Sequence, residues 1–133
     1  MSELSITTSR IQGNSTVTIM HLDGHLHGNT EHQLLDHARQ LYEDGTRHIL
    51  LDLSALEVLS SAGLRAIQNI FKLLTPPGDL EIIHQRGVEP YKSPYFKLVC
   101  PNPQIYYVLN ITGFMQSLFI FNNMDDAVGS FSS

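Results

Sequence analysis

The chain has 133 residues, of which 42% are hydrophobic and 16% carry a charged side chain. This length and composition indicate one ordinary globular domain and exclude a disordered or fibrous protein. Lys and Arg number 8 against 13 Asp and Glu, a formal net charge of −5 without any basic run, so nucleic acid is not expected as a partner.

Cysteine use and hydropathy bear on the compartment. Cys100 cannot form a disulfide within the chain because it is the single cysteine, and its neighbours Val99 and Pro101 favour a buried, unreactive thiol. The first residues lack the basic and apolar parts of a signal peptide, and no apolar stretch approaches the roughly 20 residues that cross a bilayer. A cytoplasmic protein without direct membrane insertion is therefore expected.

The first third of the sequence predicts two strands and a helix. Residues 15–22 are rich in β-branched side chains and are expected to pair with residues 4–10 across a turn at 12–14. Thr30 and Gln33 form a capping-box pattern, which predicts the start of a helix. Apolar side chains then recur at helical spacing, as Leu34, Leu35, Ala38, Leu41 and Tyr42.

A buried strand and a second helix are expected next. Gly45 is a natural end for the first helix. Residues 48–53 are nearly continuous apolar sequence apart from Asp52, which suits a central strand covered by helices. From Ser61 onward the apolar residues again follow helical spacing, and the sequence Pro-Pro-Gly at 76–78 stops that helix.

The segment after this stop is less regular. Residues 80–83 are expected to form another strand. Residues 85–96 contain Gly, Pro and Tyr without periodicity, and they are either a surface excursion or a partner-binding lobe. Residues 96–99 are expected to add a strand that either extends the sheet or closes a hairpin on residues 81–84.

The last elements complete the order. The Asn-Pro pair at 102–103 predicts the start of a helix that ends at Gly113. Residues 119–121 predict a short strand, and Asn123 is expected to cap a final helix over residues 123–128. This order predicts the α/β class, with a mixed sheet of four to six strands and helices mainly on one face.

The pair Ser60 and Ser61 stands where the second helix begins. Backbone N–H groups at a helix N-terminus are unpaired and carry partial positive charge. Ser61 is therefore well placed as a helix cap or as an acceptor of a phosphoryl group, and the pattern alone does not decide between these roles.

Several motifs resemble one known family. The stretch 52–67 resembles the signature of STAS domains, the bacterial anti-sigma factor antagonists and the related sulfate-transporter tails. Residues 24–27 are similar to the Gly-x-Leu-Asp turn of that family, and residues 109–114 resemble its late Leu-x-x-Thr/Ser-Gly-Phe/Leu motif. The resemblance extends over most of the chain outside residues 85–96, and it implies a single STAS-like domain over residues 1–133.

This resemblance implies an anti-sigma factor antagonist, a protein–protein switch without a cofactor or catalytic activity. In such proteins the serine that matches Ser61 is phosphorylated by a serine kinase that is also the anti-sigma factor, a phosphatase restores it, and the unmodified form binds. Ser60 is the second candidate acceptor, and a monomer or weak dimer is expected. Gly63 is expected to let a partner backbone approach closely. The expected partner surface comprises Leu59, Ser60, Gly63, Leu64 and Arg65 around Ser61, Asp52 and Ser54 in the loop, and His25, His27 and Asn29 on the rim.

Two other functions stay open. One is a ligand-sensing or transporter-associated STAS module without a phosphoswitch. The other is a serine hydrolase that uses Ser61, His27 and Asp52, although neither a nucleophile elbow nor an oxyanion loop accompanies them. Seven histidines invite a metal site, but no set of ligands has recognisable zinc spacing, so surface histidines and no metal are expected.

Overall fold

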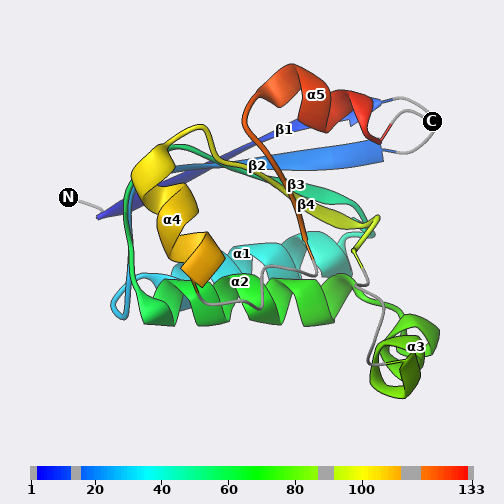
Figure 1. The fold of residues 1–133 in the computed structure, drawn as a ribbon. Helices are drawn as coiled ribbons and strands as arrows, with labels where there is room; N and C mark the ends of the chain where they lie inside the picture. Colours follow the sequence, from blue (N-terminus) through cyan, green and yellow to red (C-terminus); the bar gives the residue numbers. More distant parts are fainter. Residues whose placement is uncertain (1–2, 13–15, 87–91, 112–117, 132–133) are drawn as a thin grey trace.

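The computed structural model describes residues 3–12, 16–86, 92–111 and 118–131 and contains a five-stranded sheet with helices on both faces (Figure 1). The strands follow one another in the order β1 (Leu4–Gln12), β2 (Thr16–Leu26), β3 (Ile49–Leu59), β4 (Phe96–Val99) and β5 (Phe119–Phe121). β1 pairs with β2 antiparallel, and the other neighbours are parallel. The helices are α1 (Glu31–Glu43), α2 (Ser61–Leu74), α3 (Pro77–Arg86), α4 (Pro103–Ile111) and α5 (Met124–Gly129). The predicted mixed α/β class is confirmed.

The main core lies between one face of the sheet and the helices α1, α2 and α4, which cover that face (Figure 1). Leu34 and Ala38 of α1 and Ile67 of α2 are fully buried there, as the helical spacing of the apolar residues predicts. In β3, residues 49–51 are fully buried on both faces of the sheet. This explains why the sequence there is continuously apolar, since strands covered on both faces lack polar alternation.

The core strand is longer than the sequence predicts. Instead of ending near Leu53 and entering a loop, β3 continues to Leu59 beside β2. Residues 21–25 of β2 face residues 52–58 of β3, so β3 carries two extra residues, one at each of two bulges. Leu53, Leu56 and Leu59 are consequently buried at intervals of three, with exposed pairs between them. A strand with that spacing does not show the alternation by which strands are recognised.

The ends of α1 confirm one prediction and correct another. Gly45 has φ +105, and the N–H of Thr46 donates to the carbonyl of Leu41, which closes the helix in the expected Schellman pattern. The capping box is wrong, because the Thr30 side chain makes no cap hydrogen bond. Its hydroxyl instead accepts from the N–H of His27 at 3.0 Å, and the Gln33 amide donates to the carbonyl of Leu4.

The strand predicted at residues 80–83 is wrong, because this segment lies in helix α3. Pro77 is the first residue of α3, a position that suits its fixed φ and missing N–H, and the N–H of Leu80 donates to Pro76. The neighbouring place in the sheet is taken by β4, whose four residues are all buried between β3 and β5. The strand at 96–99 therefore extends the sheet and closes no hairpin on residues 81–84.

The two helix caps predicted in the C-terminal half agree with the structure. The Asn102 side chain accepts from the N–H of Gln104 at the start of α4, and Asn123 caps α5 by accepting from the N–H of Asp126. Of the predicted excursion at 85–96, residues 85–86 end α3, residues 92–95 precede β4, and Phe96 is the first residue of β4. Residues 87–91, residues 13–14 of the predicted turn and the predicted helix end at Gly113 lie outside the described residues. Among the described helices, none is both long and apolar enough to span a membrane.

A smaller core lies on the other face of the sheet, beneath α5 (Figure 1). It is built from Val17, Ile19, Leu50, Val99 and Ala127. Lys97 of β4 is also buried on this face, and its Nζ donates to the Ser130 carbonyl at 3.1 Å and lies 4.3 Å from the centre of the Phe131 ring. Burial lowers the pKa of the Lys97 ammonium. These contacts hold the end of α5 against the sheet.

Acidification is expected to destabilise the fold through His48, which packs on the rings of Tyr95 and Phe131. Burial, and then the charge of Lys97, lower the pKa of His48 below its ordinary value of 6.5. Between the ordinary pKa and this lowered pKa, the unfolded chain binds more protons than the folded chain. The free energy of unfolding therefore falls as the pH falls through this window. In urea unfolding at about pH 7.5 and about pH 5.5, His48→Gln should lose less stability than the wild type. The exposed His32→Gln is the control; equal losses for wild type and His48→Gln would contradict this assignment.

Candidate functional site

The candidate site lies where β3 ends and α2 begins, and Ser60 is the N-cap of that helix. The Ser60 hydroxyl accepts from the N–H of Gly63 at 3.3 Å, and the Ser60 N–H donates to the carbonyl of Leu26 at 3.0 Å. Ser60 therefore fastens the start of α2 to the end of β2. The capping role that the sequence left open for Ser61 belongs to Ser60.

Ser61 is the first residue of α2 and is exposed. Within the described part of the chain, no group hydrogen-bonds to its hydroxyl. The first-turn N–H groups of α2 surround this position with partial positive charge. The two serines thus differ: one hydroxyl is engaged in capping and half-buried, and the other is free at the surface.

The surroundings of Gly63 bear on the expected close approach of a partner backbone. A Cβ at this position would lie 2.8 Å from Leu26 Cγ, 2.8 Å from the Leu26 carbonyl oxygen and 2.9 Å from Leu59 Cδ1. The close approach that glycine permits is therefore made within the chain, between α2 and the ends of β2 and β3. Leu59 and Leu64 are 8% and 4% exposed, so their side chains support the surface from beneath and are not exposed for contact with a partner.

The exposed part of the site carries a cation and an apolar side chain. Arg65 lies one helical turn after Ser61, is exposed, and has no ion pair among the described residues. Val58, near the end of β3, is 40% exposed. Its exposure could not be predicted from the sequence, because the bulges of β3 and not an alternating pattern direct its side chain outward.

Two histidines form the neighbouring rim, as predicted for His25 and His27, and each meets a carboxylate. His25 Nε2 lies 3.2 Å from Glu57 Oε2, and His27 Nε2 lies 3.0 Å from Glu3 Oε2. His27 Nδ1 accepts from the N–H of Asn29 at 3.2 Å, so its Nε2 carries the proton that points to Glu3.

Thr30 locks the backbone of this rim. Its hydroxyl donates to the carbonyl of His25 at 2.8 Å and accepts from the N–H of His27. The roles of Glu3 and Thr30 at this site could not be predicted from the sequence. Glu3 is distant in sequence, and the Thr30 pattern resembles a helix cap.

Asp52 and Ser54 do not shape this site. Asp52 faces His21 in the β2–β3 register, whereas the site adjoins the later pair of Leu26 and Leu59. Burial alone would raise the pKa of Asp52, but hydrogen bonds from Ser54 and His21 outweigh it and lower the pKa below its ordinary value. The hydrolase array predicted from Ser61, His27 and Asp52 is therefore not assembled: the carboxylate partner of His27 is Glu3, and the histidine partner of Asp52 is His21.

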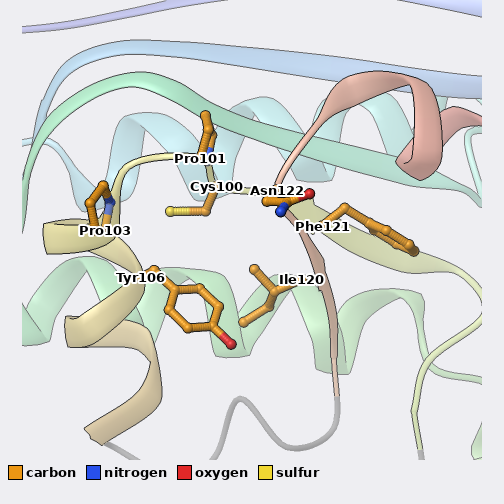
Figure 2. Close-up of a pocket in the computed structure, with 7 residues that line it drawn as sticks. All are labelled: Cys100, Pro101, Pro103, Tyr106, Ile120, Phe121 and Asn122. Atoms are coloured by element: carbon orange, nitrogen blue, oxygen red, sulfur yellow. The ribbon is translucent and has the colours of Figure 1, made fainter.

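A separate hollow of about 480 Å³ lies between α4 and β5 (Figure 2). Figure 2 shows the Cys100 thiol on the upper side of the hollow and the Tyr106 ring and the Ile120 side chain on its lower side. Cys100 is 2% exposed, which confirms the predicted burial of its thiol, and burial raises the pKa of this thiol to about 11. In the part of the chain that the structure describes, no cluster of three or more His, Cys, Asp or Glu could hold a metal.

Comparison with known sequences identifies the family. The sequence profile of the STAS domain matches residues 8–78, which run from within β1 to the start of α3 and include the whole junction around Ser61. The chain belongs to the STAS domain family. The resemblance stated from the motifs is thereby confirmed. A search of curated proteins finds no relative of similar sequence.

Solved structures share the fold of this STAS domain. An anti-sigma factor antagonist from Mycobacterium paratuberculosis is 21% identical with a TM-score of 0.73, and the match covers 97% of this chain and 96% of that chain. The anti-sigma factor antagonist SpoIIAA in its unphosphorylated form is 13% identical with a TM-score of 0.60, over 93% of this chain and 94% of that chain. The Bacillus cell fate determinant SpoIIAA in its phosphorylated form is 13% identical with a TM-score of 0.59, over 94% of this chain and 97% of that chain. At these identities the likeness shows the fold.

Proposed function

We propose that this STAS domain is a cytoplasmic anti-sigma factor antagonist with a phosphorylation switch at Ser61. The unmodified form binds an anti-sigma factor that is also a serine kinase, the phosphorylated form releases it, and a phosphatase resets the chain. The observation that carries this proposal is the exposed Ser61 hydroxyl at the first position of α2, which has no hydrogen-bond partner among the described residues, beside the Ser60 hydroxyl that is engaged as the cap. Structures of SpoIIAA in both phosphorylation states support it.

The position of Ser61 suits a reversible modification. A phosphate adds about −1.5 to −2 charges, and at a helix N-terminus the backbone dipoles favour that charge. Phosphorylation there leaves the helix intact and changes only the surface that it presents. A kinase reaches the exposed hydroxyl without unfolding the chain.

Arg65 gives the switch a second element. Residues four apart on a helix are neighbours, so a phosphate on Ser61 lies within reach of the Arg65 guanidinium. A partner that binds Arg65 through a carboxylate then loses this cation to the phosphate and meets the phosphate charge as well. Both effects weaken the complex, and the desolvation of a charged phosphate in the interface adds to them.

Mapping of the phosphate tests the proposal. The chain is purified from cells of the source organism, and its phosphopeptides are sequenced by mass spectrometry. We expect phosphate on Ser61 in the wild type and in Ser60→Ala, and none in Ser61→Ala. Phosphate on Ser60, or on another residue in both variants, would overturn the assignment of the switch.

The two serines should also differ in their effect on stability. Ser60→Ala removes the N-cap of α2 and is expected to cost about 1 kcal/mol of unfolding free energy. Ser61→Ala removes no hydrogen bond of the described structure and should change it by less than about 0.5 kcal/mol. Urea unfolding of the two variants measures both values. A larger loss for Ser61→Ala would assign the cap to Ser61 instead.

One observation favours the alternative, a ligand-sensing STAS module. The hollow between α4 and β5 has the size of a small-molecule site and is lined largely by apolar groups, among them Tyr106 and Ile120. In this case Ser61 is an ordinary surface residue, and its substitution leaves partner binding unchanged. Equal capture of partners by the wild type, Ser61→Ala and Ser61→Asp would favour this function over the switch.

A further inference from the structure

The sheet face that packs against α5 also carries a polar array, which lies next to the smaller core beneath that helix. Along β1, β2 and β3 this face presents Ser9, His21 and Asp52 in adjacent strands, beyond the apolar residues Ile19 and Leu50 that α5 covers. Ser9 Oγ lies 3.0 Å from His21 Nε2, and His21 Nδ1 lies 2.8 Å from Asp52 Oδ2. The array has no part in the proposed switch.

Hydrogen bonds fix the proton positions in this array. The other oxygen of Asp52, Oδ1, accepts from the N–H of Ser54 at 3.0 Å and from the Ser54 hydroxyl, and these bonds favour the carboxylate form. A carboxylate only accepts, so His21 Nδ1 carries the proton of the neutral ring. His21 Nε2 is then the acceptor that faces the Ser9 hydroxyl. This is the order of nucleophile, base and orienting carboxylate used in acyl transfer.

We infer that Ser9 is a nucleophile that attacks small activated esters, with His21 as its general base and Asp52 as the residue that orients His21. Ser9 Oγ forms a bond to the ester carbonyl carbon while its proton passes to His21 Nε2. The bond from that carbon to the leaving oxygen then breaks, and the proton on His21 passes to this oxygen. Water attacks the acyl-serine, its proton returns through His21 to Ser9 Oγ, and the acid leaves.

The surroundings define the substrate class. Ser9 and its neighbours on β1 are exposed, and the His21 side chain is 37% exposed, so the array faces solvent on an open surface. An exposed sheet surface gives little binding energy to an acyl chain, which favours small esters with good leaving groups. In the described sheet β1 pairs on one side only, and an edge strand presents outward N–H groups that can stabilise a developing oxyanion.

The test uses the full chain with p-nitrophenyl acetate as the probe. Release of p-nitrophenolate is followed by absorbance, and the acetylated residue is located by peptide mass spectrometry. We expect one acetyl group on Ser9, and a fall in the release rate of about tenfold or more in Ser9→Ala and in Asp52→Asn. Ser5→Ala, an exposed serine on the same strand and face, should keep the wild-type rate.

Two readouts distinguish the loss of the Ser9 nucleophile from misfolding and from nonspecific acetylation. Thermal unfolding of each variant shows whether the fold is retained, and the wild-type acetylation site needs no variant at all. Acetyl groups on lysines, on the N-terminus or on His21 but not on Ser9 would overturn the inference. A release rate in folded Ser9→Ala equal to that of the wild type would do the same.

Discussion

Gly63→Ala is expected to lower the free energy of unfolding by about 2 to 3 kcal/mol, the range of overpacked sites in a protein core. The new methyl would lie 2.8 Å from Leu26 Cγ and 2.9 Å from Leu59 Cδ1, too close for either contact to persist. The Leu26 carbonyl oxygen, also at 2.8 Å, belongs to the backbone and accepts the Ser60 N–H, so it cannot move without loss of that bond. Relief therefore requires α2 to shift away from the sheet.

Urea unfolding measures this effect, and Gly78→Ala is the matched control. Gly78 lies in α3, and no atom lies within 4 Å of a Cβ built there. The control should change stability by less than about 0.5 kcal/mol or increase it slightly, because alanine restricts the unfolded chain. Equal stability of the two variants would contradict the close packing of α2 on Leu26. A shift of α2 in Gly63→Ala should also displace Ser61 and weaken partner binding.

Local signals in the sequence predicted much of the fold. Gly45 ends α1, Asn102 caps α4 and Asn123 caps α5 as expected, because each acts through hydrogen bonds to residues that are close in sequence. The continuous apolar run after His48 predicted the central strand correctly, because burial on both faces determines its composition. Such features depend on a few neighbouring residues and can be inferred without the rest of the fold.

The predictions of secondary structure are wrong where contacts between distant residues determine the structure. The bulges of β3 give buried residues at intervals of three, so the sequence pattern beyond Leu53 predicts a loop where the structure has a strand. The segment 80–83, with the sequence Leu-Glu-Ile-Ile, is too short to distinguish strand from helix, and Pro77 begins a helix there.

The candidate site shows the same division. The junction at Ser61 was predicted from the helix start and from family motifs. The ion pair of His27 with Glu3, the buried contact of Gly63 with Leu26 and the array of Ser9 with His21 all join residues from different elements. Short motifs do not encode such contacts, because they depend on strand order and register.

Ser61→Asp is expected to weaken binding of the partner by about 100-fold, which corresponds to about 2.7 kcal/mol. The aspartate places one negative charge beside Arg65 and in the interface, whereas a phosphate places nearly two. Full switching from 99% to 1% bound requires about 5.5 kcal/mol, so the phosphorylated chain should bind more weakly still. Calorimetric titration of the purified partner with each variant measures the change. Ser61→Ala should bind like the wild type, since it adds no charge.

Affinity capture from a lysate of the source organism tests the switch most directly, with wild type, Ser61→Ala and Ser61→Asp as baits and quantitative mass spectrometry as the readout. We predict that a serine kinase of the anti-sigma factor type is enriched by the wild type and by Ser61→Ala and is lost with Ser61→Asp. Capture of the same proteins in equal amounts by all three baits would contradict the switch at Ser61.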